Sequence, residues 1–232
     1  MQLPDNVIIT GASDGIGAAL AVLFAPSRRL VLSYSRNIDA AYAVRHECLM
    51  RGATEVWCVQ LDLANERSIK DFASEALMDT EERCLLVQNA GVFVEETLSD
   101  QTYEDLYLQM AVNATGPQVL TKRMLGMLGH VAFIGSDVGV KAIPGMPVYC
   151  ASKYAIRGFA RALSLDHPDL PVTCINPNRT ATSMNGGIGH PVTTTANAIY
   201  QALVGDIPAH PDDVVGNFRE INLDHHLGPP PT

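Results

Sequence analysis

Tyr149 and Lys153 stand four residues apart at the start of a predicted helix, and Ser136 precedes Tyr149 by thirteen residues. Positions i and i+4 lie on one face of a helix, so the phenol and the ammonium group are neighbours. A phenol with its ordinary pKa of about 10 is a poor acid or base at neutral pH, but a nearby positive charge stabilises the phenolate and lowers that pKa. The three residues therefore indicate acid–base chemistry at a tyrosine, although Tyr-x-x-x-Lys alone is a common pattern.

A glycine-rich turn, Thr10–Gly17 (TGASDGIG), connects the first predicted strand to the first predicted helix. Gly11 and Gly15 allow backbone angles that other residues avoid, and Gly17 lets the helix pack closely on the sheet. Free N–H groups at the start of a helix bind a pyrophosphate well. The turn lacks the Gly-Lys-Ser/Thr sequence of a kinase-type phosphate loop, which disfavours phosphoryl transfer. We predict dinucleotide binding here, with a turn that binds nothing as the alternative.

Ser35 and Arg36 follow the second predicted strand, where a dinucleotide-binding fold contacts the ribose 2′ position. A carboxylate at this place binds the 2′-hydroxyl of NAD, whereas an arginine accommodates the 2′-phosphate of NADP. NADP(H) is therefore favoured over NAD(H). Asp39 lies nearby, and Asp14 occupies a loop position where a second basic residue would have helped. A solvated surface arginine without a ligand stays open as an alternative.

These residues need a scaffold that brings strand ends together. Short apolar runs alternate with longer amphipathic ones, which predicts parallel strands joined by right-handed helical crossovers. We predict an α/β fold, a Rossmann-like doubly wound parallel β-sheet of about seven strands with helices on both faces. The expected strands are 6–10, 30–34, 55–61, 84–88, 130–135, 171–175 and 214–221, and the expected helices are 15–25, 39–50, 66–78, 103–127, 149–166 and 194–204.

The composition limits the class of protein. With 47% apolar and 18% charged residues, the 232 residues describe one compact domain, 1–232, with a frayed tail at 224–232. The net charge of −9 gives no general attraction for nucleic acid or an anionic membrane. The start lacks the pattern of a secretory signal and no apolar run could span a bilayer, so a cytoplasmic location is expected. Five scattered cysteines without a Cys-x-x-Cys pair predict neither disulfides nor a metal site.

Further motifs follow in order along the chain: Asp62 after the third predicted strand, Asn89-Ala90-Gly91 after the fourth, and Asn113-Ala114-Thr115-Gly116 in the long predicted helix. Together with the glycine-rich turn, Ser136 and the Tyr149/Lys153 pair, they resemble the short-chain dehydrogenase/reductase family. Each motif alone is weak, but their order and spacing together are specific. The resemblance covers most of the chain.

The resemblance implies a role for each residue. Tyr149 would be the general acid in carbonyl reduction and the general base in alcohol oxidation, while Ser136 would hold the substrate oxygen. Lys153 would lower the Tyr149 pKa and hold the nicotinamide ribose, and Asn113 would hold a water of a proton relay. The residues implied to line the cofactor are Gly11, Ser13, Asp14, Gly15, Ile16, Gly17, Ser35, Arg36, Asp62, Leu63, Asn89, Ala90, Gly91, Tyr149, Lys153, Thr180 and Thr182.

The segment after the sixth predicted strand departs from the family pattern at one place. The usual Pro-Gly after the sixth strand is Pro177-Asn178 here, and asparagine is among the few residues that tolerate positive φ. Arg179, the next residue, has no assigned role. Residues 183–192 are expected to form a short substrate lid.

The implied function is NADP(H)-dependent hydride transfer to or from a small or medium carbonyl or secondary alcohol. The resemblance also implies a homodimer or homotetramer packed through helices 103–127 and 149–166. Two alternatives stay open: a dinucleotide-sensing module without turnover, and a lyase or epimerase built on the same fold.

Overall fold

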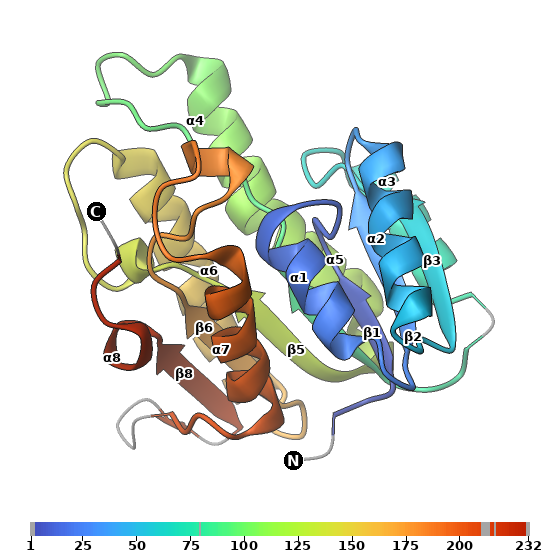
Figure 1. The fold of residues 1–232 in the computed structure, drawn as a ribbon. Helices are drawn as coiled ribbons and strands as arrows, with labels where there is room; N and C mark the ends of the chain where they lie inside the picture. The colour runs from blue at the N-terminus through green and yellow to red at the C-terminus, as the bar shows by residue number, and fades with distance from the viewer. Residues whose placement is uncertain (1–2, 79, 210–213, 216, 231–232) are drawn as a thin grey trace.

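The chain folds around one β-sheet with helices on both faces (Figure 1). The computed structural model describes residues 3–78, 80–209, 214–215 and 217–230. Within these ranges the sheet has eight strands in the order β3-β2-β1-β4-β5-β6-β8-β7, and the direction of winding reverses between β1 and β4. The parallel strands are β1 (Asn6–Ile9), β2 (Arg29–Tyr34), β3 (Glu55–Gln60), β4 (Cys84–Gln88), β5 (Leu128–Ile134), β6 (Val172–Asn176) and β8 (Phe218–Asn222). The predicted doubly wound α/β fold is confirmed.

The prediction of a single final strand at 214–221 is wrong. Instead, β7 (Val214–Val215) pairs antiparallel with β8, with Val215 opposite Phe218. The two residues between them in the sequence, Gly-Asn, are typical of a tight hairpin turn. The chain therefore doubles back at this edge of the sheet.

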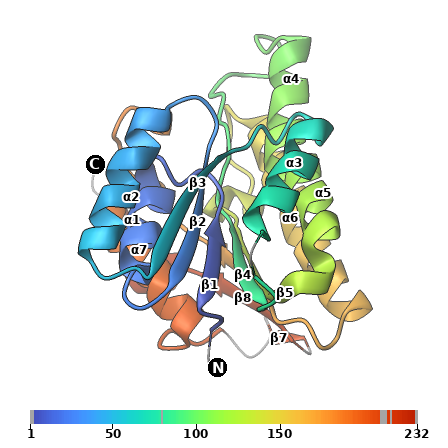
Figure 2. The ribbon, with the colours of Figure 1, turned by 90° about the vertical axis from the view of Figure 1, so that its right-hand side faces the viewer.

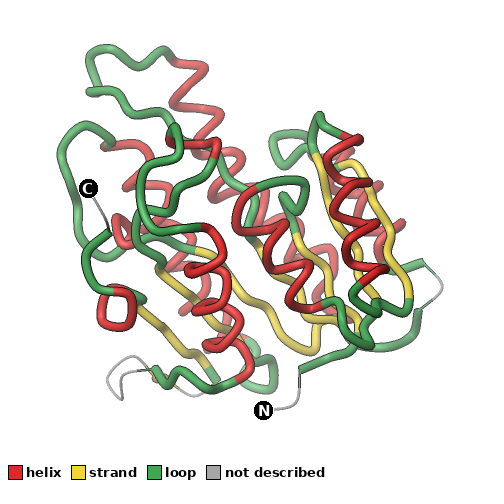
Figure 3. The backbone as a smooth tube through the Cα atoms, in the orientation of Figure 1, coloured by secondary structure: helices red, strands yellow, loops and turns green. Residues whose placement is uncertain are grey.

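Helices form a layer on each face of the sheet, as Figure 2 shows. One face carries α1 (Gly15–Phe24), α2 (Ile38–Met50) and α7 (Val192–Val204), and the other carries α3 (Glu66–Ala76), α4 (Tyr103–Met110), α5 (Gly116–Met124) and α6 (Pro147–Asp166). Figure 3 traces how helices and strands alternate along the chain. Within the described ranges, no helix has both the length and the apolar character needed to cross a membrane.

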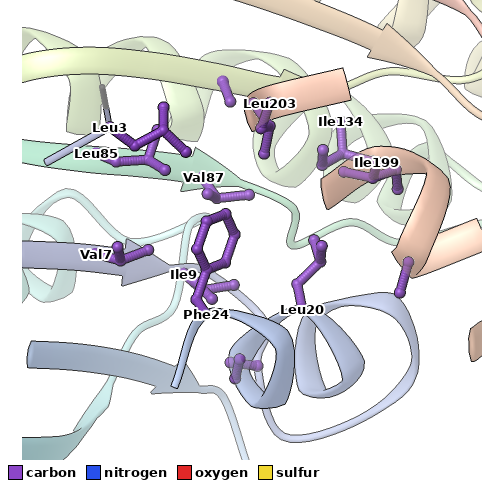
Figure 4. Packing of buried hydrophobic residues seen from close by; sticks show 14 of the residues in the cluster. Leu3, Val7, Ile9, Leu20, Phe24, Leu85, Val87, Ile134, Ile199 and Leu203 are labelled. Carbon is purple, nitrogen blue, oxygen red and sulfur yellow. The ribbon is translucent and has the colours of Figure 1, made fainter. Parts of the chain in front are cut away.

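Each face of the sheet has its own apolar core, because successive side chains of a strand point to opposite faces. Val7 and Ile9 of β1 belong to the cluster beneath α1 and α7, which Figure 4 shows with Phe24 among them. Ile8 packs on the other face, in the cluster that includes Phe133. All of these side chains are fully buried. The strands are therefore fixed from both sides, and their carboxyl ends are held in register.

The long helix predicted for 103–127 is interrupted. A π-helical turn, η1 (Ala111–Thr115), separates α4 from α5, and a 3₁₀ turn, η2 (Leu125–Met127), follows α5. Pro117 has no N–H and its ring would clash with the carbonyl four residues earlier, so an unbroken α-helix is disfavoured here. The N–H of Gly116 instead donates to the carbonyl of Ala111, five residues back. This wider turn carries Asn113.

The tail expected to be frayed at 224–232 is ordered over its first part. Helix α8 (Asp224–Leu227) follows β8 directly. The side chains of Asn178 and His190 both donate hydrogen bonds to the carbonyl of Gly228, at 2.9 and 3.2 Å. These contacts hold the end of the chain against the segment that follows β6. Residues 231–232 lie outside the described residues.

Candidate active site

A cleft of about 790 Å³ opens where the carboxyl ends of the parallel strands meet. This volume suits a small molecule or cofactor, and the location is the usual one for a ligand in a doubly wound sheet. It brings together nearly all of the predicted site residues: Gly11, Ser13, Asp14, Gly15, Ile16, Ser35, Arg36, Asp62, Leu63, Asn89, Ala90, Gly91, Ser136, Tyr149, Lys153, Thr180 and Thr182. Two predicted residues, Gly17 and Asn113, do not line it.

Hydrogen bonds connect the glycine-rich turn to the start of the segment after β4. The side-chain amide of Asn89 donates to the carbonyls of Thr10 and Gly11 at 3.0 and 3.2 Å. A Cβ atom on Gly17 would lie 2.3 Å from the Gly11 carbonyl oxygen and 2.5 Å from the Asn89 amide nitrogen. Gly17 therefore allows the close packing expected of it, from behind the cleft wall. Gly15 starts α1 at a positive φ of 57°.

Two hydroxyl groups that the sequence analysis missed also fix this turn. Thr10 Oγ1 accepts hydrogen bonds from the backbone N–H groups of Asn89 and Ala90, at 2.9 and 3.0 Å. Ser33 Oγ accepts from the N–H of Gly11 at 2.9 Å. The sequence does contain a signal for both residues, because each is a polar residue at the buried end of an otherwise apolar strand.

Asp14 brings a negative charge to the beginning of α1. Its carboxylate accepts a hydrogen bond from the N–H of Gly15 at 2.6 Å, which caps the helix. The hydroxyl of Ser183 also donates to this carboxylate. Ser183 begins the short helix η4 (Ser183–Asn185) in the segment expected to be a lid, so that segment is joined to the glycine-rich turn.

Ser35, Arg36 and Asp62 lie at the ends of β2 and β3, exposed on the cleft wall. The Arg36 guanidinium makes no ion pair or hydrogen bond with any described residue. The Asp62 carboxylate accepts a hydrogen bond from the N–H of Ala64 at 2.9 Å. Arg36 is therefore available for an anionic ligand, whereas Asp62 is partly used in shaping its own turn.

Tyr149 and Lys153 lie on successive turns of α6, as the spacing predicts. Lys153 Nζ is 5.6 Å from the centre of the Tyr149 ring and donates to the carbonyl of Ile134 at 3.1 Å. Phe93 meets the Tyr149 ring edge-on, with 4.9 Å between ring centres. Ser136 follows β5 and lines the same cleft. The three residues thus meet at one place.

Burial shifts the pKa values of both Tyr149 and Lys153. Burial raises the pKa of Tyr149 to about 12; the Ser136 hydroxyl opposes this shift, and Asp137 and Cys150 add to it. Burial also lowers the pKa of Lys153 to about 8, with a smaller opposite effect from Cys174. Burial is the largest cause of the Tyr149 shift in the protein alone, and the lowering of this pKa by Lys153 stays a prediction. Tyr149 is therefore protonated at neutral pH and can donate a proton.

Asn113 lies behind the cleft wall rather than in it. Its side-chain oxygen accepts from the N–H of Val92 at 2.8 Å, and its amide donates to the Val92 carbonyl at 2.8 Å and to Ser152 Oγ at 3.1 Å. Ser152 Oγ in turn donates to the carbonyl of Tyr149 at 2.8 Å. The Asn113 side chain therefore joins the segment after β4 to α6. Its role in a proton relay stays a prediction.

A model of the short chain dehydrogenase family matches residues 5–192. The chain belongs to this family. It is 31% identical over 201 residues to the dehydrogenase/reductase SDR family protein 7-like of Drosophila melanogaster, a match that covers 81% of this chain and 62% of the fly protein. The chain thus spans less than two thirds of that relative's length.

Two further comparisons cover nearly the whole chain. The 3-oxoacyl-acyl-carrier-protein reductase of Synechocystis is 28% identical over 225 residues, which cover 94% of this chain and 88% of that protein. The solved structure of an alcohol dehydrogenase from the archaeon Thermococcus sibiricus, complexed with 5-hydroxy-NADP, is 27% identical and superposes with a TM-score of 0.82 over 94% of each chain.

The asparagine that replaces the family's glycine after β6 takes a different conformation from the one expected. The only described non-glycine residue with positive φ is Ser27, so Asn178 does not adopt the left-handed backbone. Its amide instead holds the Gly228 carbonyl, while its buried Oδ1 has no hydrogen-bond partner among the described residues. The next residue, Arg179, pairs with Glu95 at 3.4 Å across the segment that follows β4.

Proposed function

We propose that this protein is an NADP(H)-dependent oxidoreductase, which transfers a hydride between the nicotinamide and a small or medium carbonyl or secondary alcohol. One observation carries the proposal. Ser136, Tyr149 and Lys153 line the same cleft as the glycine-rich turn at the start of α1. Acid–base groups and a dinucleotide-binding turn within one cavity suit chemistry on a bound cofactor. This proposal also rests on the dehydrogenase and reductase relatives.

The residues of the cleft fit the dinucleotide that the family implies. Gly11 and Gly15 of the glycine-rich turn line the cleft at the beginning of α1, where N–H groups favour a pyrophosphate. Arg36 is exposed at the end of β2, where a 2′-phosphate would need a cation. The unpartnered Oδ1 of Asn178 offers an acceptor to an amide donor such as a carboxamide. When bound, the dinucleotide supplies or accepts the hydride.

Side chains of the protein donate the proton and bind the substrate oxygen. In reduction, the protonated Tyr149 donates its proton to the carbonyl oxygen, and the Ser136 hydroxyl stabilises the charge that develops there. Lys153, buried beside the Tyr149 ring, stabilises the phenolate that remains. The remaining wall is apolar around Tyr149, with Phe93, Val138 and Met146, and suits the hydrocarbon part of a carbonyl compound.

A panel of carbonyls with NADPH, and of secondary alcohols with NADP, tests the proposed activity through the absorbance of NADPH. We expect turnover with at least one small or medium compound. A protein that binds NADPH but turns over none of the panel would instead favour the dinucleotide-sensing alternative.

Arg36→Ala tests the preference for NADP(H). We expect its NADPH Kd to rise at least about tenfold, because a charge-assisted hydrogen bond to phosphate contributes about 1.5–3 kcal/mol, while the NADH Kd stays nearly constant. Arg51→Ala is the matched control, since Arg51 is also exposed but pairs with Glu47 at the end of α2, outside the cleft. Fluorescence titrations of both cofactors measure the effect. Equal affinities of the parent protein for NADPH and NADH would contradict the assignment.

We further propose a homodimer or homotetramer packed through α4, α5 and α6. Large aromatic side chains are exposed on two of these helices, with Tyr103 and Tyr107 on α4 and Tyr154 on α6. Exposed aromatic residues on neighbouring helices suit a protein interface. Sedimentation velocity is expected to give at least twice the mass of one chain. A monomer at micromolar concentration would be the opposite result.

A further inference from the structure

The hydroxyl group of Ser136 is already engaged by the residue that follows it. Ser136 Oγ donates to Asp137 Oδ1 at 3.1 Å and accepts from the N–H of Val138 at 3.4 Å. A serine hydroxyl has a single proton to donate. The Asp137 carboxylate, which also lines the cleft, therefore competes for the proton that Ser136 would offer to a substrate oxygen.

The backbone fixes the position of Asp137. Its N–H donates to the carbonyl of Pro177 at 3.0 Å, and its own carbonyl accepts from the N–H of Lys141 at 3.0 Å. The Asp137 side chain is about one fifth exposed. The carboxylate is therefore held beside Ser136 by the fold, rather than by a flexible loop.

Asp137 also has a cationic neighbour that it shares with α8. Lys141 Nζ lies 3.7 Å from Asp137 Oδ2 and only 2.8 Å from Asp224 Oδ2. The hydrogen bond from Lys141 to Asp224 raises the pKa of Lys141, so the ammonium is charged at neutral pH. Asp224 begins α8, which Figure 1 shows beside the end of β8. Ser136, Asp137, Lys141 and Asp224 thus form a chain of contacts from the cleft to α8.

Tyr149 is affected by the charge of Asp137. The groups around its phenol are the Ser136 hydroxyl and the Asp137 carboxylate from the segment after β5, and Cys150 and Lys153 from α6. Cys174 of β6 interacts with Lys153. The negative charge of Asp137 raises the pKa of Tyr149. The Ser136 hydroxyl has the opposite effect and lowers this pKa, so a Ser136 proton that is donated to Asp137 is less available to stabilise the phenolate.

We propose that Asp137 is a positioning residue, which holds the Ser136 hydroxyl and withholds its proton from Tyr149, and that Lys141 and Asp224 adjust how strongly it does so. This inference rests on the proposed function. Removing the carboxylate leaves the Ser136 proton free for the phenolate or the substrate oxygen. Carbonyl reduction, which needs protonated Tyr149, then loses activity at a lower pH.

Three substitutions are expected to have three distinct effects on the alkaline limb, the fall of kcat/KM for carbonyl reduction at high pH. Asp137→Asn moves the limb to lower pH by about half a unit or more, the scale expected for removing one charge within several ångströms of a partly buried group. Asp224→Asn moves it less in the same direction, because Lys141 is released to neutralise Asp137. Lys141→Met moves it to higher pH, and much of this shift disappears in the Asp137→Asn background. Lys70→Met, an exposed lysine on α3, leaves the limb unchanged.

A merely structural role for Asp137 would lower the melting temperature of these variants without moving the limb in opposite directions. If the parent enzyme is active but the alkaline limb does not move in the variants, or moves in the same direction in all of them, the inference is overturned and the proposed function stays intact. Direct titration of Tyr149 by phenolate absorbance, as the difference from Tyr149→Phe, applies even to a protein without turnover. The Asp137→Asn variant is expected to titrate at lower pH in this assay, and an unchanged titration also overturns the inference.

Discussion

Tyr149→Phe is expected to lower kcat/KM for carbonyl reduction by about 10²–10⁴-fold, the range for loss of a general acid. The phenylalanine ring keeps the edge-on contact with Phe93 and the position beside Lys153, but has no proton to donate. The Kd for NADPH should therefore change little. Steady-state kinetics and a fluorescence titration of NADPH measure the two quantities separately.

Tyr154→Phe is the matched control for this substitution. Tyr154 lies on the same helix, five residues after Tyr149, and its hydroxyl donates to the carbonyl of Val140 at 2.7 Å on the protein surface. Its loss is expected to cost about 1 kcal/mol of stability or less and to leave kcat unchanged. A Tyr149→Phe enzyme with substantial activity, or equal losses in the two variants, would refute the acid–base assignment.

Gly17→Ala is expected to weaken NADPH binding by at least about tenfold and to destabilise the fold by about 1–3 kcal/mol, the range for inserting a methyl group into a well-packed site. The new methyl group would lie 2.3 Å from the Gly11 carbonyl oxygen, so the glycine-rich turn or α1 must shift. Intrinsic helix propensity acts in the opposite direction, because alanine favours a helix by about 1 kcal/mol over glycine. A thermal melt and an NADPH titration measure both effects.

Gly158→Ala separates these two effects. Gly158 also lies in a helix, α6, but a Cβ atom there meets no atom within 4 Å. This variant should be slightly more stable than the parent and bind NADPH normally. Weakened NADPH binding in Gly158→Ala, or normal binding in Gly17→Ala, would contradict the role assigned to the glycine-rich turn.

Local spacing was enough to predict much of the cleft. The glycine-rich turn, Ser136, and the Tyr149/Lys153 pair each depend on a strand end or on a single helix face, and the apolar runs show where those elements lie. The parallel order of the sheet then brings the strand ends together. Asn113 was found by its motif, but the π turn before Pro117, which puts its side chain behind the cleft wall, could not be predicted from that motif.

Contacts between distant parts of the chain could not be predicted from local patterns. Asn178 and Gly228 are fifty residues apart, and Lys141 and Asp224 are eighty-three residues apart. The pKa of Tyr149 could not be predicted either, because it depends on a balance between burial and charge that the spacing of residues in the sequence does not reveal. These are the places where tertiary packing, rather than local sequence, determines the chemistry.

Transfer of deuterium from NADPH that carries deuterium at both positions of nicotinamide C4 tests the central claim most directly, once the panel has identified a carbonyl substrate. Mass spectrometry of the alcohol product is expected to show one deuterium on the carbinol carbon with the parent protein and with Tyr154→Phe, and almost no product with Tyr149→Phe. Consumption of NADPH without deuterium in the product, or full product formation by Tyr149→Phe, would contradict the proposed hydride transfer with Tyr149 as the proton donor.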